Sequence, residues 1–145
     1  MKKRLLACVL TLVMLLALLP TAALAADPTT SGSCGKNLTW SFDSATGTLT
    51  ISGTGAMADY TEASDQPWYS YANAITAVTL ENGITAIGAH SLRELTAINT
   101  PLALPRSLEK IGSCALYMAH FSAFTVDAEN TAFTAKNGVL YNKDM

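Results

Sequence analysis

The residues whose types could support catalysis are few, and they form no recognisable catalytic arrangement. His90 and His120 are the two histidines of the 145-residue chain. Ser91 follows His90 directly, but adjacency in sequence does not establish the geometry of a catalytic triad. Neither histidine has an acid and a nucleophile at a familiar spacing. We therefore expect solvated or packed histidines in a protein that is not an enzyme.

Acidic residues gather in two short stretches that could bind Ca²⁺ through side-chain oxygens. The first contains Asp59, Glu62 and Asp65, and the second contains Asp127, Glu129 and Asn130. Neither has the glycine and glutamate positions of an EF-hand loop, so solvated loops are the favoured interpretation. Gly53-Thr54-Gly55 lacks the third glycine and the strand-to-helix setting of a dinucleotide-binding loop. We expect no metal and no cofactor.

The run Pro67–Tyr71 brings three aromatic residues together. Trp68, Tyr69 and Tyr71 could form a stacking platform for a sugar or a peptide, because aromatic residues dominate recognition hot spots. Alternatively, Trp68 packs onto the neighbouring structural unit. Packing is the favoured interpretation, and the three rings are kept as candidate ligand contacts.

The N-terminus has the three regions of a secretory signal peptide. Lys2–Arg4 is positively charged, Leu5–Leu19 is apolar, and Ala23–Ala25 supplies the small residues that signal peptidase reads. The apolar run is shorter than the roughly 20 residues of a spanning helix, which argues against an uncleaved anchor. We expect cleavage after Ala25, secretion, and no membrane insertion of the mature chain.

Loss of residues 1–25 changes the charge and the cysteine count. The remaining chain has six basic and eleven acidic residues, which gives a net charge of −5. Nucleic acids attract clusters of Lys and Arg, and none follows residue 25, so no nucleic-acid partner is expected. Cys34 and Cys114 remain, without a Cys-x-x-Cys zinc motif. Export permits a disulfide. Two separate thiols are favoured because the cysteines fall on different expected elements, and the question of pairing stays open.

One pattern occurs twice between Val78 and Leu116. The matched pairs are Val78/Leu102, Leu80/Leu104, Ile84/Leu108, Ile87/Ile111, Gly88/Gly112 and Leu92/Leu116. Their common spacing, which we call the repeat period, is about 24 residues and lies within the roughly 20–29 residues typical of leucine-rich repeats. Each unit predicts a short strand, Thr76–Leu80 and then Leu102–Leu104, followed by a turn. Such units bury their apolar faces only by stacking on neighbours.

Alternating apolar residues predict strands on both sides of the repeats. Residues 38–42 and 49–51 flank the turn Asp43–Gly47 and predict a β-hairpin. A stack of repeats needs its end covered, so we expect this hairpin to act as a cap. Near the C-terminus, Asn137-Gly138 predicts a tight turn before the strand Val139–Tyr141, because Asn-Gly suits left-handed conformations.

The repeats resemble the BspA-like leucine-rich repeat of bacterial surface proteins. The second unit keeps that family's Leu104-Pro105, Ser107-Leu108, Ile111-Gly112 and Ala115. The two units depart from the family where Leu92 and Leu116 replace an aromatic residue and where the usual cysteine and spacer are missing. The hairpin and the Pro67–Tyr71 run resemble the segments that precede the family's first repeat. The C-terminal part resembles an irregular repeat without its last strand, which favours a truncated N-terminal portion.

The expected fold is mainly β, a short leucine-rich-repeat solenoid with an N-terminal β-hairpin cap. We divide the chain into a signal peptide (1–25), a flexible leader (26–36), the hairpin cap (37–74), two degenerate repeats (75–118) and a C-terminal irregular repeat or hairpin, interpreted as truncated (119–145).

The expected function is non-enzymatic binding outside the cell or at its surface. Parallel strands would present a rigid face that loses little entropy on binding, with Thr76, Thr79 and Ala103 as outward candidates. The family resemblance implies adhesion to a host or matrix protein or glycan. The alternative function is a structural spacer or N-terminal module whose enzymatic or anchoring domain lies beyond residue 145. The sequence leaves the ligand, the mode of surface attachment and the oligomeric state open.

Overall fold

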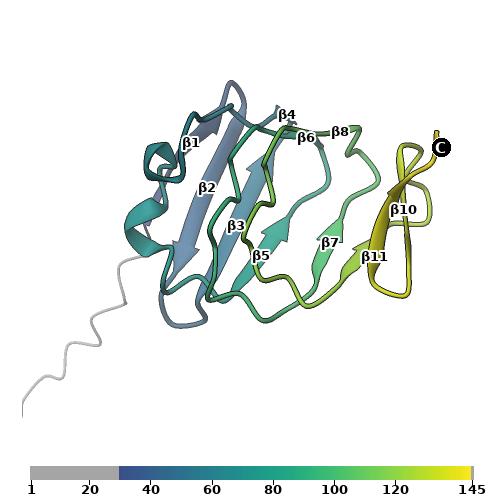
Figure 1. The fold of residues 1–145 in the computed structure, drawn as a ribbon. Coiled ribbons are helices and arrows are strands. Elements are labelled where there is room, and N and C mark those ends of the chain that lie inside the picture. The colour runs from purple at the N-terminus through teal and green to yellow at the C-terminus, as the bar shows by residue number, and fades with distance from the viewer. Residues whose placement is uncertain (1–29, 145) are drawn as a thin grey trace, which may run out of the picture.

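The computed structural model describes residues 30–144, which fold mainly as β-strands (Figure 1). This part of the chain contains eleven strands and two short 3₁₀ helices. The mainly β fold class predicted from the sequence is therefore confirmed. The predicted signal peptide, residues 1–25, lies outside the described residues.

The first three strands form an antiparallel unit. They are β1 (Thr30–Gly35), β2 (Leu38–Asp43) and β3 (Thr48–Gly53). The predicted hairpin is present as β2 and β3, with Asp43 opposite Thr48. Asp43 Oδ1 closes its turn by accepting a bond from the Ala45 N–H at 2.9 Å. Gly47 has a φ of 67°, a left-handed conformation that glycine adopts without a steric penalty.

Strand β1 corrects the prediction of a flexible leader (26–36) for residues 30–35, whereas residues 26–29 lie outside the described residues. Residues 30–35 pair antiparallel with β2, and Ser31 lies opposite Ser41. The small residues that suggested flexibility serve packing instead, since a Cβ at Gly32 would lie 2.8 Å from Nε1 of Trp40. Strand β1 also covers the edge of β2, which would otherwise expose unpaired backbone groups.

Parallel strands then continue from β3 along one side of the molecule. Strand β5 (Ala77–Leu80) pairs parallel with β3, and β7 (Leu102–Leu104) pairs parallel with β9 (Phe124–Val126). Figure 1 shows β3, β5 and β7 side by side, although β5 and β7 belong to separate hydrogen-bonded sheets. The two repeat strands expected near 76–80 and 102–104 are therefore present.

A second row of parallel strands lies on the other side of the core. It consists of β4 (Gly55–Ala56), β6 (Ile84–Ile87) and β8 (Lys110–Ile111). Ile87 lies opposite Ile111 in this row. Residues that the sequence matched one repeat period apart are therefore paired across neighbouring strands. Apolar side chains from both rows form one continuous core, which includes Trp68 as well as Leu49, Ile84, Leu102 and Leu108.

The chain between the two rows forms turns that stack on one another. The N–H groups of His90, Leu92 and Glu94 donate to carbonyls of the next unit at Ser113, Ala115 and Tyr117, over 2.9–3.1 Å. Two 3₁₀ helices, η1 (Ala63–Asp65) and η2 (Tyr69–Tyr71), precede these turns. No helix among residues 30–144 is long and apolar enough to cross a membrane.

The C-terminal hairpin follows the prediction closely. Strands β10 (Phe133–Lys136) and β11 (Val139–Asn142) pair antiparallel. Asn137 and Gly138 both have positive φ, 54° and 78°, as the predicted tight turn requires. The Phe124 N–H donates to the Gly138 carbonyl at 2.9 Å, which fastens the hairpin to β9.

Candidate functional site

Trp68 is part of the core and not of a surface platform. Its side chain has 0% exposure. Its ring meets those of Trp40 and Tyr60 edge to face, with centroids 5.9 and 6.1 Å apart. A buried ring cannot stack against a ligand, so Trp68 has the packing role that the sequence favoured.

The two tyrosines of the run point in different directions. Tyr71 is half-buried, stacks on Phe42 at 5.0 Å, and accepts a 3.0 Å hydrogen bond from Thr30 Oγ1. Tyr69 is 48% exposed. The structure therefore does not bring the three candidate rings together, and Tyr69 is the one that a ligand could reach.

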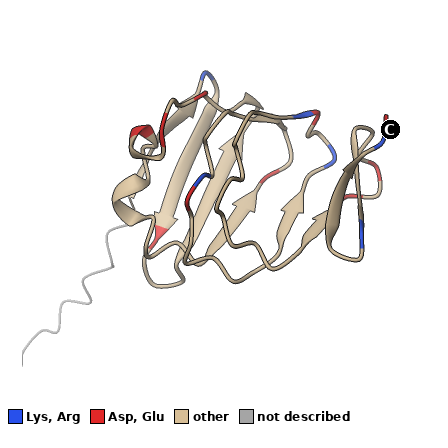
Figure 2. Ribbon diagram, viewed as in Figure 1, with Lys and Arg blue, Asp and Glu red and all other residues tan. Residues whose placement is uncertain are grey.

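Tyr69 borders a shallow hollow of about 330 Å³. The hollow is lined by Glu62, Ala63, Ser64, Tyr69, Arg93 and Glu94. It lies between the η1–η2 segment and the first stacked turn, and Figure 2 shows that the charged residues of the molecule lie mostly on such turns and loops. The strands themselves carry few charges.

Three residues on this face are evenly spaced in the sequence. Tyr69, Arg93 and Tyr117 follow one another at intervals of one repeat period, and we call them the turn column. The Arg93 guanidinium carbon lies 5.4 Å from the centroid of the Tyr117 ring, within the range of a cation–π interaction. Arg93 also lines the hollow with Tyr69. The column therefore presents an aromatic ring, a cation and a second aromatic ring.

Gln66 joins the two segments that form the hollow. Its Nε2 donates to the carbonyls of His90 and Arg93 at 2.6 and 3.1 Å, and the residue is only 3% exposed. Asp65 Oδ2 accepts from the backbone N–H groups of Thr61 and Glu62 at 3.3 and 3.1 Å. Both walls of the hollow are thus held by hydrogen bonds before any ligand arrives.

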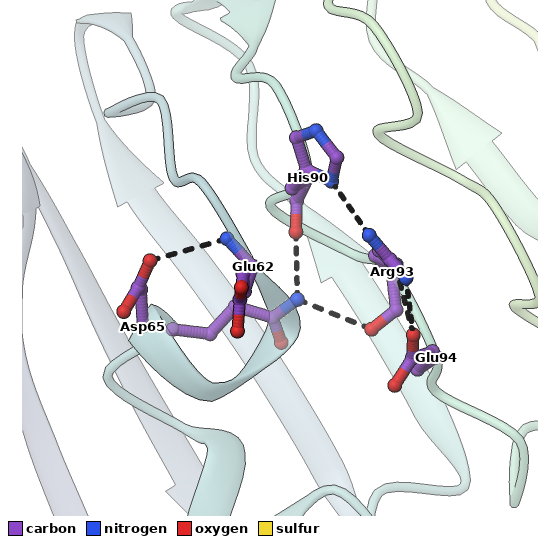
Figure 3. Close-up of polar contacts among 6 residues, drawn as sticks. Glu62, Asp65, His90, Arg93 and Glu94 are labelled. Atoms are coloured by element: carbon purple, nitrogen blue, oxygen red, sulfur yellow. Dashed lines mark hydrogen bonds and ion pairs between the residues drawn. The ribbon is translucent and has the colours of Figure 1, made fainter.

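Arg93 is fixed by its neighbours (Figure 3). Its Nε and Nη2 both lie 2.8 Å from the same oxygen of Glu94, Oε1. Its Nη1 lies 3.2 Å from His90 Nδ1. Three of its five N–H groups are therefore directed at neighbouring side chains. Its positive charge is largely balanced by Glu94.

Sequence reasoning missed Arg93, Glu94 and Tyr117 as candidate contacts. The signal that could have found them is the repeat register. Once Ile87 is matched to Ile111, the same repeat period places Arg93 above Tyr117 in neighbouring turns.

The histidines and Ser91 form no catalytic arrangement within residues 30–144. His90 is hydrogen-bonded to Arg93, whereas the Ser91 side chain is fully buried and its Oγ has no hydrogen-bond partner there. His120 is exposed, and its backbone N–H donates to the Leu95 carbonyl at 3.3 Å. Neither imidazole is bonded to a carboxylate or a hydroxyl in this part of the chain.

The two cysteines are free thiols, so they do not pair in this structure. Cys34 on β1 is buried, and burial raises the pKa of its thiol from an ordinary value of 9.0 to about 11. Burial, with a smaller contribution from the Cys34 charge, raises the pKa of Tyr60 to about 12. Cys114 lies in an exposed turn.

The acidic candidates accept from backbone N–H groups or, for Glu129, from the Arg106 guanidinium at 2.8 Å. Asp59 Oδ1 accepts from the Ala89 N–H at 2.7 Å, and Asp127 Oδ1 accepts from the Glu129 N–H at 2.9 Å. Asn130 is buried, and its side chain bonds to backbone groups of Leu108 and Phe133. Among residues 30–144, no three His, Cys, Asp or Glu side chains are grouped to hold a metal ion.

The residues expected to face outward from the strands have small side chains. Thr79 and Ala103 are exposed, but Thr76 precedes β5, and its Oγ1 donates to the Gly47 carbonyl at 3.4 Å. These small side chains offer a ligand little area. The turn column offers larger and more varied groups.

A second concavity, of about 810 Å³, lies between the β4–β6–β8 row and the C-terminal hairpin. Apolar side chains on it include Ile111, Leu116, Phe133 and Leu140. Strand β8 is the end strand of its row. The concavity is therefore the open end of the stack within the described residues.

Comparisons with known proteins assign no family to this chain. No family model matches it, and no curated protein matches it. A similar solved structure is that of a leucine-rich repeat protein from Eubacterium ventriosum, with a TM-score of 0.45 and 20% identity over 80% of this chain. The match covers 49% of that protein, so this chain spans about half of its length. At this identity and score, the likeness gives no function to the chain.

Proposed function

We propose that the chain is a secreted or cell-surface leucine-rich repeat protein, of the BspA-like kind, that binds a protein or glycan partner without chemical turnover. The observation that carries the proposal is the turn column, in which Tyr69 on η2 and Arg93 and Tyr117 on two stacked turns follow one another at one repeat period. Tyrosine and arginine are the residues that most often dominate binding energy at interfaces.

Rigidity supports the same proposal. Gln66 and the ladder of backbone bonds hold the turns, and Glu94 and His90 hold Arg93. A surface that is already ordered loses less conformational entropy when a partner binds. The two exposed tyrosines then supply contact area at a small ordering cost.

The test is a binding screen with the secreted form, from residue 26, against arrays of extracellular proteins and glycans. We expect at least one partner, and we expect the double variant Tyr69→Ala/Tyr117→Ala to lose most of the binding. Tyr141→Ala, an equally exposed tyrosine on β11, is the matched control and should bind normally. The absence of any ligand, or equal binding by the double variant, would overturn the proposal.

The second candidate function is a structural module of a longer surface protein. The apolar concavity beside β8 supports it, because a further repeat could pack against Ile111, Leu116 and Phe133. Intact-mass measurement of the native product, from culture medium and from the cell-wall fraction, tests this candidate. A wall-bound species much larger than residues 26–145 would favour the module, and a free species of that size would exclude it.

A further inference from the structure

We infer that the hollow between Tyr69 and Arg93 receives a lysine or arginine side chain from the surface of a partner protein. The inference rests on the proposed binding function and specifies the chemistry of the contact. It is argued from the charges that line the hollow, the donors and acceptors around it, and its size.

Negative charge exceeds positive charge at the hollow. Glu62 and Glu94 contribute two carboxylates, and Arg93 contributes one guanidinium. Arg93 is bound to Glu94 Oε1 through two nitrogens, contacts His90, and stacks on Tyr117. An anionic ligand would therefore meet two carboxylates and a guanidinium with three of its five N–H groups already directed at Glu94 and His90, whereas a cationic ligand meets complementary charge.

The free acceptors point to a ligand with N–H donors. Both bonds from Arg93 go to Oε1 of Glu94, which leaves Oε2 for another donor. Gln66 is not among the residues that line the hollow, so its buried Oε1 is not counted as an acceptor for the ligand. An ammonium or guanidinium group supplies donors and no acceptors.

The aromatic rim and the volume fit one cationic side chain. Tyr69 presents a half-exposed ring at the edge of the hollow, and the face of such a ring attracts a cation. A volume of about 330 Å³ is at the low end of ligand pockets, which span roughly 300–1,000 Å³. The net charge of −5 after residue 25 also steers basic partners towards the molecule.

The test is a titration of the ¹⁵N-labelled secreted form with four capped tripeptides, acetyl-Gly-X-Gly-amide, in which X is Lys, Arg, Gln or Glu. We expect the Lys and Arg peptides to shift the amide signals of Tyr69, Arg93 and Glu94 at millimolar concentration, and 0.5 M NaCl to reduce the shifts. Equal shifts from the Glu or Gln peptide, or shifts confined to other residues, would overturn the inference.

Charge-neutral variants distinguish binding in the hollow from non-specific attraction of the peptide to the acidic protein surface. Glu62→Gln should weaken binding of the Lys peptide at least threefold, because it removes one carboxylate and keeps the side-chain size. Glu81→Gln, an exposed carboxylate outside the hollow, should leave binding unchanged. Equal weakening by both variants would show non-specific attraction and overturn the inference.

The outcomes also separate this inference from the proposed function. A partner found on the arrays that needs Tyr69 and Tyr117 but binds Glu62→Gln normally would overturn the cationic contact and support the proposed function. Specific binding of the Lys peptide, with no partner on any array, would support the contact chemistry and count against the proposed function.

Discussion

Four residues with side chains adopt the left-handed backbone conformation at repeated positions. His90 and Cys114 have φ of 56° and 52°, and Glu94 and Met118 have φ of 61° and 56°. The members of each pair are one repeat period apart. Residues with a Cβ pay roughly 1–2 kcal/mol for this conformation, because the Cβ crowds the backbone. The stacked turns therefore impose the same strain in each unit.

Glycine at the two exposed positions, Cys114 and Met118, should stabilise the protein. Each of Cys114→Gly and Met118→Gly should raise the free energy of unfolding by about 0.5–1 kcal/mol, since the relieved strain exceeds the added chain entropy of glycine. Urea denaturation measures the change. Ser113→Gly is the matched control at a neighbouring position without positive φ, and it should destabilise by about 0.5–1 kcal/mol. Destabilisation by all three substitutions would contradict the prediction.

Burial of Cys34 should make the fold sensitive to alkaline pH. The pKa of its thiol is about 11 in the folded chain and 9.0 ordinarily, so the folded state holds the proton more tightly. The contribution of the protonated thiol to the free energy of unfolding is complete below pH 9 and is lost as the pH rises from 9 through 11. The urea midpoint should therefore be level near pH 7–8 and fall above pH 9. Cys34→Ala should fall less steeply, and parallel curves for the two proteins would refute the assignment.

Side chains that bridge neighbouring units hold the stack in register. Ser107 Oγ accepts from the Gly83 N–H and donates to the Ile84 carbonyl, both at 2.8 Å. Asn130 Nδ2 donates to the carbonyls of Pro105 and Leu108 at 2.8 and 2.9 Å. In each case the partners lie about one repeat earlier in the chain.

Asn130→Ala should destabilise the protein by about 3 kcal/mol. The substitution removes two buried hydrogen bonds, to the Leu108 carbonyl and from the Phe133 N–H, and two part-buried ones, to the Pro105 carbonyl and from the Ala132 N–H. Buried polar groups without partners cost roughly 1–3 kcal/mol each. Thermal and urea unfolding measure the loss. Asn99→Ala, at an exposed position, should change stability by less than about 0.5 kcal/mol, and similar effects of the two substitutions would contradict the bridging role.

The whole molecule is a stack in which each unit contacts its neighbours. The antiparallel unit β1–β3 lies at one end and the β10–β11 hairpin at the other (Figure 1). Stability in such a stack is approximately a sum of local terms and nearest-neighbour contacts. A destabilising substitution at one end should therefore lower the local stability of that end more than that of the other.

Gly138→Ala tests this locality. Gly138 has a φ of 78°, and a Cβ there would lie 3.1 Å from the Ala123 Cβ, so alanine is strained by about 1–2 kcal/mol. Hydrogen exchange should accelerate by about tenfold in β10 and β11 and remain unchanged in β2 and β3, since about 1.4 kcal/mol corresponds to a factor of ten. Gly47→Ala, in the turn between β2 and β3, should show the reverse pattern. Equal acceleration of hydrogen exchange at both ends would show that the stack unfolds as one cooperative unit and would contradict the prediction.

Local patterns predicted much of the fold because they depend on neighbours in sequence. Alternating apolar residues identified β2 and β3, and Asn137-Gly138 identified the last turn. The prediction of a flexible leader failed because small residues such as Gly32 were read without the Trp40 ring that they accommodate. The site was predicted less well, since Trp68 and Tyr69 are adjacent in sequence but have opposite exposure.

The amino-acid sequence by itself determined the repeat register, since the repeat period recurs in the pairing of Ile87 with Ile111. It also determined the hairpin turns, whose backbone conformations follow from local chemistry. Only the tertiary structure decided which side chains face solvent, that Gln66 joins η1 to the next turn, and that Arg93 lies between Glu94 and Tyr117. Those contacts depend on how the units stack, and stacking is set by burial of the shared apolar core.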